Sequence, residues 1–237
     1  MTARTVRNRL LRSLPAEEQR VLLPQLRRVV LRKGEVVVPA NTPLTEAWFP
    51  EGGLASVIAG SGQGRLQEVG LFGREGMGSP AVVLGAMQTP HHTVMQASGT
   101  WLRIEADALH AALRQMPGLN GLLHRYMHVF MVGLANTALS NGRQTIEERL
   151  ARWLLMAHDR LDGDDLPLTH EFLSMMLGVR RSGVTTEIHI LEGLHLIKAN
   201  RARIHIQDRE GLQKLAGDCY GMPEAEYERL IGIRFSK

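Results

Sequence analysis

The chain has 237 residues, of which 44% are hydrophobic and 22% charged, and its formal net charge is +4. This composition is typical of a globular protein with about one or two domains and a sizeable core. No apolar run reaches the roughly 18 residues of a membrane span, and no apolar signal core follows the basic N-terminus. We therefore expect a cytoplasmic protein without membrane contact. The single cysteine, Cys219, excludes an internal disulfide, a four-thiolate iron–sulfur cluster and a cysteine-rich zinc site.

The first half of the chain predicts a small β-roll. Residues 6–26 predict one or two short helices around Pro15 and Pro24. From residue 29 to residue 104, short apolar runs alternate with Gly, Pro and Asn, which indicates closely spaced strands and turns. Residues 60–64 have the composition of a hairpin tip. Many short strands at this spacing favour a roll or jelly roll, followed by a helix that Pro117-Gly118 interrupts.

Residues 119–141 predict a long helix that is apolar on more than one face. Such a helix needs two packing partners: its own domain and, most naturally, a second copy of the chain. The alternative is a helix buried inside one large domain. Gly142 is expected to break this helix and to act as a hinge. Thr145 and Glu148 predict a capping box that starts the next helix. The apolar side chains of the long helix are Leu122, Leu123, Tyr126, Met127, Phe130, Met131, Leu134 and Leu139.

Residues 168–206 predict a helix, a glycine turn, a second helix and a two-stranded hairpin. Thr169 can cap the first helix, and Gly178 suits the sharp turn. The second helix is expected over residues 181–192, ended by Gly193, and its apolar stripe consists of Val184, Ile188 and Leu191. Together these elements form a winged helix-turn-helix, which places one helix in the DNA major groove. An ordinary packing corner is the alternative.

The charge distribution supports a nucleic-acid partner for this segment. Residues 144–237 carry 13 Lys and Arg and 15 Asp and Glu, a net charge of −2. Within them, residues 178–206 carry five Lys and Arg and only two Glu, a local net charge of +3. A local positive face with acidic flanks suits specific docking. Short hydroxyls and guanidinium groups are the groups that contact phosphates and base edges. The candidate DNA-binding residues are Thr169, His170, Arg180, Arg181, Ser182, Thr185, Thr186, Lys198, Asn200 and Arg201.

Residues 169–206 resemble the DNA-binding domain of the CRP/FNR family of bacterial transcription regulators. The order of roll, long helix, hinge and winged helix extends this resemblance over about residues 8–217, with landmarks at residues 33–35, 49–54 and 72–75. Arg181 matches the family's arginine at the start of the recognition helix. Ser182 and Thr186 stand where the family has an acidic residue and a second arginine, so the family's usual half-site is not carried over.

The resemblance implies an α+β fold: an N-terminal jelly-roll-like β-roll effector domain, a long dimerisation helix and a C-terminal winged helix-turn-helix. The expected divisions are 1–116 for the roll, 117–143 for the dimerisation helix and hinge, 144–220 for the DNA-binding domain and 221–237 for a C-terminal tail. The expected function is a homodimeric regulator of a palindromic operator in double-stranded DNA, with RNA polymerase as a further partner for an activator. The alternative is a ligand-sensing or protein-interaction module without specific DNA binding. No Walker loop, dinucleotide fingerprint or nucleophile elbow indicates an enzyme.

The family's cyclic-nucleotide motif is incomplete. The family opens its phosphate loop with Gly-Glu and closes it with Arg-Ser or Arg-Thr, whereas here Gly73 precedes Arg74 and the closing pair is His91-His92. Because a neutral histidine poorly replaces a permanent cation, cAMP and cGMP are not expected. The roll then binds another effector or serves as a scaffold, and no cofactor or metal is expected, since the pairs His91-His92 and His124-His128 lack further ligands. The candidate effector pocket comprises Gly73, Arg74, Glu75, His91, His92 and Thr93.

Overall fold

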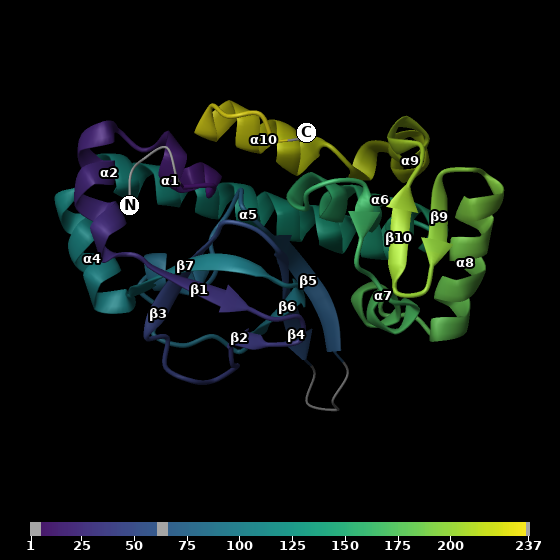
Figure 1. Cartoon of the computed structure of the whole chain (residues 1–237), viewed down its shortest axis with the longest axis horizontal. Coiled ribbons are helices and arrows are strands. Elements are labelled where there is room, and N and C mark those ends of the chain that lie inside the picture. Colours follow the sequence, from purple (N-terminus) through teal and green to yellow (C-terminus); the bar gives the residue numbers. More distant parts are fainter. Residues whose placement is uncertain (1–5, 61–65, 236–237) are drawn as a thin grey trace.

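The computed structural model describes residues 6–60 and 66–235 (Figure 1). The chain begins with α1 (Arg9–Ser13), α2 (Ala16–Leu22) and the 3-10 turn η2 (Leu23–Gln25). The Asn8 side chain caps α1 by accepting a hydrogen bond from the Leu11 backbone N–H at 3.1 Å. Asn8 also donates to the carbonyl groups of Pro50 and Gly76, which fixes the N-terminal segment to the roll. The short helices predicted around Pro15 and Pro24 are confirmed.

Two antiparallel sheets form the predicted β-roll. One has the strand order β1-β7-β3 and the other β2-β6-β4-β5. Trp101 lies between them, with its ring centroid 5.7 Å from that of Phe72 and 6.3 Å from that of Trp48. Gly60 pairs with Leu66. The hairpin tip was predicted at residues 60–64, of which residues 61–64 lie outside the described residues. The strands are β1 (Arg27–Leu31), β2 (Val36–Val38), β3 (Glu46–Pro50), β4 (Leu54–Gly60), β5 (Leu66–Phe72), β6 (His92–Ala97) and β7 (Gly99–Glu105), with α3 (Pro80–Val83) between β5 and β6.

The long helix is α5 (Pro117–Arg143), which follows α4 (Ala106–Gln115) after the predicted interruption at Pro117. The prediction that Gly142 breaks this helix is wrong, because α5 continues through Gly142 and Gln144 is its extended C-cap. A glycine inside a helix costs only about 1 kcal/mol. The end is set instead by Gln144, whose amide donates to the Ala216 carbonyl at 2.7 Å, and by the capping box of Thr145 and Glu148.

The C-terminal domain is built on α6 (Ile146–Arg160). The other elements are β8 (Asp165–Leu166), α7 (His170–Leu177), α8 (Arg181–Gly193), β9 (Ile197–Asn200), β10 (Arg203–Ile206), α9 (Arg209–Ala216) and the 3-10 turn η3 (Gly217–Cys219). The strands pair in the antiparallel order β8-β10-β9. Gly193 does not end α8 as a C-cap glycine: the helix includes it, Leu194 is the cap, and His195 takes the left-handed conformation with φ of 57°.

The apolar core of the C-terminal domain continues onto the roll. Leu54, Ile58 and Leu71 of strands β4 and β5 belong to the same buried cluster as Leu154 and Leu173. Lys33 adds a polar contact, because its ammonium donates to the Pro167 carbonyl at 2.9 Å. The C-terminal domain therefore packs directly against the roll as well as following α5 in the chain.

The segment expected as a C-terminal tail contains α10 (Met222–Ile231), which packs along α5 (Figure 1). Beyond it, Phe235 is buried with its ring centroid 5.0 Å from that of Tyr227. The Arg9 guanidinium donates to the Phe235 carbonyl, so the two ends of the described chain meet. Helix α10 is thus one partner for the second apolar face of α5. Over residues 6–60 and 66–235, no helix combines the length and the hydropathy required to cross a membrane.

Candidate nucleic-acid interface

The helix-turn-helix has the local geometry that the sequence predicts. The Thr169 hydroxyl caps α7 by accepting from the Phe172 backbone N–H at 3.2 Å. Gly178 ends α7 with φ of 65° and ψ of 31°, a left-handed conformation that a side chain would strain. Val184, Ile188 and Leu191 are fully buried and fix one side of α8 to the domain core. The opposite side of α8 is therefore left for a partner.

Helix α8 lies at the outer edge of the C-terminal domain, on the side away from the roll (Figure 1). Arg180, Arg181, Ser182 and Thr186 are exposed, and Thr185 is half-buried. The Thr185 hydroxyl donates to the Arg181 carbonyl at 3.0 Å, and the Thr186 hydroxyl donates to the Ser182 carbonyl at 3.1 Å. Thr185 and Thr186 can therefore contact a base through their methyl groups and through the remaining lone pairs of their hydroxyl oxygens.

His170 links the two helices of the motif. Its Nδ1 lies 3.0 Å from the Thr185 hydroxyl oxygen, and since that hydroxyl donates to Arg181, His170 is the donor in this contact. Burial, followed by the nearby charge of Arg181, lowers the pKa of His170 below its ordinary value. The ring therefore stays neutral near pH 7 and positions Thr185.

A hollow of about 510 Å³ lies between the start of α7, helix α8 and the wing. Five predicted residues line it together: Thr169, His170, Arg181, Asn200 and Arg201. Arg180, Ser182, Thr186 and Lys198 lie outside the hollow and are exposed. The structure thus gathers half of the predicted residues around one concavity bordered by two guanidinium groups.

The wing is the hairpin of β9 and β10, whose tip carries Ala202 with φ of 58°. Ile197, Ile204 and Ile206 are buried, while Lys198 and Arg201 point to solvent. Asp165 of strand β8 lies 3.5 Å from the Arg203 guanidinium and 3.0 Å from His205 Nδ1. Because Asp165 offsets the charge of Arg203, the cations that the wing presents to a polyanion are Lys198 and Arg201.

Three polar residues of this surface were missed by sequence reasoning. Glu171, His189 and Glu192 also line the hollow. His189 has a side-chain exposure of 69% and follows Thr185 by four residues, so helical spacing from Arg181 could have found it. Glu192 accepts a hydrogen bond from the Ala199 backbone N–H at 2.8 Å. Glu192 therefore holds the wing strand β9 against α8.

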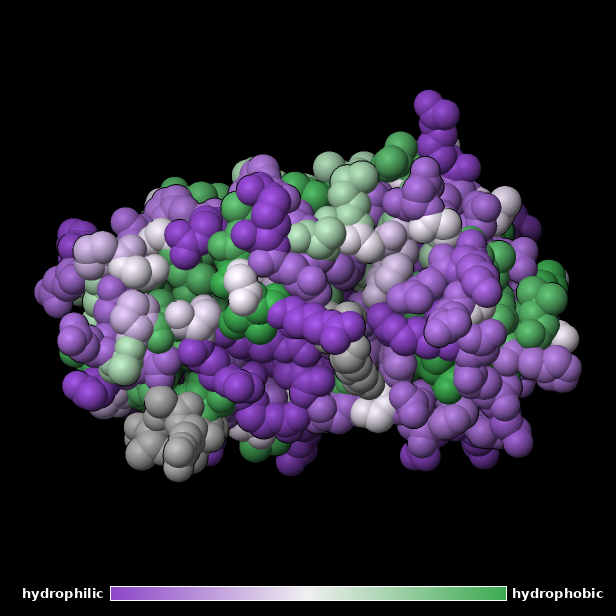
Figure 2. Space-filling view, turned by 90° about the horizontal axis from the view of Figure 1, so that it is seen from above, coloured by the Kyte–Doolittle hydropathy of each residue, from purple (hydrophilic) through white to green (hydrophobic). Residues whose placement is uncertain are grey.

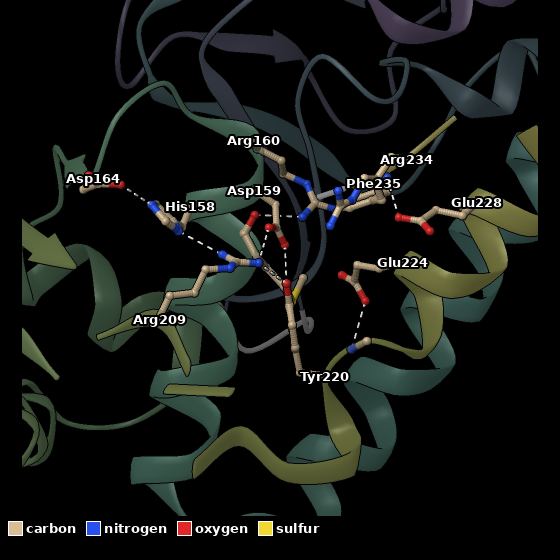
Figure 3. A network of polar contacts seen from close by, with 12 residues as sticks. His158, Asp159, Arg160, Asp164, Arg209, Tyr220, Glu224, Glu228, Arg234 and Phe235 are labelled. Carbon is tan, nitrogen blue, oxygen red and sulfur yellow. Dashed lines mark hydrogen bonds and ion pairs between the residues drawn. The ribbon is translucent and has the colours of Figure 1, made fainter. Parts of the chain in front are cut away.

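A polar network holds the scaffold behind this surface (Figure 3). The buried Asp159 carboxylate accepts from Arg209 at 2.6 Å and from the Tyr220 hydroxyl at 2.7 Å. Arg209 also donates to His158 Nδ1 at 2.8 Å, so His158 uses its Nε2–H toward Asp164 at 2.7 Å. Helices α6 and α9 are thereby fixed to each other and to the loop before β8.

The candidate effector residues are divided between two places. His91 and Thr93 line a cavity inside the roll, whereas His92 Nδ1 accepts from the Ala40 backbone N–H at 3.2 Å. Arg74 lies 2.5 Å from Asp162, and the hydrogen bond from Arg7, followed by that from Arg74, lowers the pKa of the Asp162 carboxyl to about 2. Glu75 accepts from Arg160 at 2.8 Å and from the Gly73 N–H at 3.0 Å. Residues 73–75 therefore face the C-terminal domain and not the cavity.

The histidine pair of α5 makes contacts within the chain. His124 Nδ1 lies 2.9 Å from the Asn120 carbonyl, and His128 Nε2 lies 3.1 Å from the Glu226 carboxylate. Over the described ranges, His, Cys, Asp and Glu side chains form no group of three or more that could hold a metal ion. That no cofactor or metal is bound stays a prediction from the sequence.

A β-roll, a long helix and a winged helix-turn-helix in this order define the fold class of the chain. Residues 148–215 match the family model of the Crp-like helix-turn-helix domain. Residues 148–215 are thus similar to a Crp-like helix-turn-helix domain, and the chain has the fold seen in solved structures of CRP and CRP/FNR family regulators. No curated protein matches the sequence significantly.

Solved structures show the same fold over most of the chain. FixK2 from Bradyrhizobium japonicum has 16% sequence identity and a TM-score of 0.69, covering 81% of this chain and 98% of that one. TTHB099, a CRP-family transcriptional regulator from Thermus thermophilus, has 18% identity and a TM-score of 0.67, covering 80% and 97%. CLP, the c-di-GMP responsive global regulator of Xanthomonas campestris, has 14% identity and a TM-score of 0.66, covering 81% and 99%. Identity this low supports a common fold and no common ligand.

Proposed function

We propose that the protein is a sequence-specific DNA-binding transcription regulator that acts as a homodimer and not as an enzyme. The observation that carries the proposal is the outward polar face of α8 beside the hollow and the basic wing. Viewed from above, the C-terminal domain presents a mostly hydrophilic surface (Figure 2). A helix with one buried apolar stripe and one exposed polar face, next to a cationic hairpin, is suited to the major groove and its phosphates.

Most of the predicted residues of this surface have a proposed role. Arg181 reads a guanine edge or an adjacent phosphate, and Ser182 and Thr186 make weaker hydroxyl or methyl contacts to bases. Thr169 and Arg180 at helix starts, with Lys198 and Arg201 in the wing, contact the phosphate backbone. Asn200 lines the hollow beside Arg201, and its proposed role is also a contact to the phosphate backbone.

The exposed face of α5 supports the dimer. Met131 and Leu139 are 56% and 48% exposed, and Ala135 and Ala138 lie between them on the surface. Large apolar side chains at helical spacing on an outer face mark a surface that is covered in an assembly. A second copy packed antiparallel or parallel along α5 would cover it, and two-fold symmetry would place two α8 helices about one DNA turn apart.

The test is selection of bound sequences from random duplex DNA at near-physiological salt, with wild type and Arg181→Ala in parallel. Enrichment of a two-fold symmetric motif by the wild type supports the proposal, and loss of one base preference in the variant assigns that base to Arg181. Salt-sensitive binding without any motif contradicts sequence specificity. No binding by a folded dimer favours a ligand-sensing or protein-interaction module.

A further inference from the structure

His189 lies on the polar side of helix α8, in its third turn. It follows Ser182 by seven residues and Thr186 by three, and residues at these spacings share one side of a helix. Its side chain is 69% exposed, and it lines the hollow together with Arg181. His189 is therefore placed to meet any partner that docks against α8.

Glu192 decides which nitrogen of the His189 ring carries the proton. Both oxygens of the Glu192 carboxylate have a partner: Oε1 accepts from the Ala199 backbone N–H at 2.8 Å, and Oε2 lies 3.3 Å from His189 Nδ1. An ionised carboxylate only accepts hydrogen bonds, so His189 donates from Nδ1. Because a neutral imidazole has a single N–H, Nε2 keeps a free lone pair and acts as an acceptor.

An accepting ring nitrogen distinguishes between bases. In the major groove, adenine and cytosine each expose an amino group that donates, whereas guanine and thymine expose only accepting atoms. His189 therefore matches adenine or cytosine, while Arg181, which only donates, matches guanine. Eight residues of helix separate the two side chains by about 12 Å along its axis, a span of about three or four base pairs.

We propose that His189 is a specificity-determining residue of the DNA interface. Its Nε2 accepts a hydrogen bond from the amino group of an adenine or cytosine, and Glu192 is the positioning residue that holds the ring in the required tautomer. Since the same carboxylate binds Ala199 of strand β9, the wing supports this base contact without touching the base. The base contact rests on the proposed function, whereas the tautomer of His189 does not.

The tautomer is tested in the free protein by long-range ¹H–¹⁵N NMR of the histidine rings at pH 8, where imidazole is ordinarily neutral. His189→Ala identifies the signals of His189 by their loss. The wild type should carry the proton on Nδ1. Glu192→Gln keeps an oxygen for the Ala199 N–H and turns an amide N–H toward His189, so the proton should move to Nε2. A wild-type ring protonated on Nε2, or one tautomer shared by both proteins, overturns the inference.

Base preference is measured at the same pH by fluorescence anisotropy on the site that the wild type selects, with each base pair substituted in turn. At one position the wild type should prefer adenine or cytosine by about 2- to 12-fold, the worth of one hydrogen bond. His189→Ala should lose this preference, and Glu192→Gln should reverse it toward guanine or thymine. A loosened wing would weaken binding to all sequences alike, so the reversal separates positioning of His189 from support of the wing.

Glu187→Gln is the matched control, because it makes the same change on α8 at a half-buried carboxyl outside the hollow, near Glu147. It should leave every base preference unchanged. A selected motif that His189→Ala leaves intact, or a uniform loss in Glu192→Gln without reversal, overturns the inference and leaves the proposed function standing. If the wild type selects no motif at all, the proposed function itself is overturned.

Discussion

Glu75 of the roll and Arg160 of helix α6 form a buried ion pair of 2.8 Å across the boundary between the two domains. Their side chains are only 4% and 8% exposed. The Arg160 guanidinium also lies 5.0 Å from the centre of the Phe235 ring (Figure 3). One side chain thus joins the roll, the first helix of the C-terminal domain and the segment after α10, which fixes the orientation of the C-terminal domain relative to the roll.

Replacing Arg160 by methionine should destabilise the protein strongly. The change keeps much of the side-chain length but leaves the Glu75 carboxylate buried without its cation. Breaking such a pair from one side costs about 3–5 kcal/mol. Urea unfolding of wild type, Arg160→Met, Glu75→Gln and the double variant measures the coupling. The double variant should recover part of the loss, and strictly additive effects would show that the pair is not coupled.

The stability of the chain should depend on pH through Glu68. This carboxylate accepts from the Trp153 indole at 2.7 Å and from the Ser56 hydroxyl, and burial raises its pKa from 4.5 to about 7. Between these values the folded protein keeps a proton that the unfolded chain releases. The free energy of unfolding therefore falls as pH rises from 4.5 to 7, by an amount on the order of 3 kcal/mol.

Glu68→Gln is the variant that isolates this effect, because the amide can accept from Trp153 and donate to Ser56. The free energy of unfolding of Glu68→Gln, measured by urea titration at several pH values, should exceed that of wild type increasingly from pH 4.5 to 7. Glu105→Gln, an exposed carboxyl on the roll, is the control and should follow wild type. Parallel curves for wild type and Glu68→Gln would contradict the prediction.

Arg181→Ala should weaken binding to the selected DNA site by about 1–3 kcal/mol and relax one base position. Fluorescence anisotropy on the selected site and on single-base variants measures both effects. The matched control is Arg32→Ala, which removes an exposed arginine of the roll and should change affinity little. An equal loss on every sequence would make Arg181 a phosphate contact.

Met131→Glu should break the dimer, because a charge placed on an apolar contact face is left without a partner when that face is covered. Sedimentation equilibrium should give the monomer mass for this variant. Met222→Glu is a matched control, since Met222 on α10 is 55% exposed and Met131 is 56% exposed. If Met131→Glu remains a dimer, the interface lies elsewhere.

Parts of the fold and site could be predicted because their causes are local. The Thr169 cap, the left-handed Gly178 and the buried stripe of α8 each depend on residues within one or two turns of helix. The predictions that Gly142 and Gly193 end their helices were wrong for a related reason. A glycine permits a helix to end but does not force it, and neighbouring caps such as Gln144 and Thr145 decided the first boundary.

The sequence by itself determined the order of roll, long helix and winged helix, because hydrophobic periodicity and caps are properties of short segments. Only the tertiary structure decided that Glu75 pairs with Arg160 and does not line the roll cavity. It alone also decided that α10 packs along α5. It also decided that His189 joins Arg181 on one hollow and that His91 and Thr93 line one cavity of the roll. These relationships depend on residues far apart in the chain, and burial selects their partners through space in a way that no local pattern records.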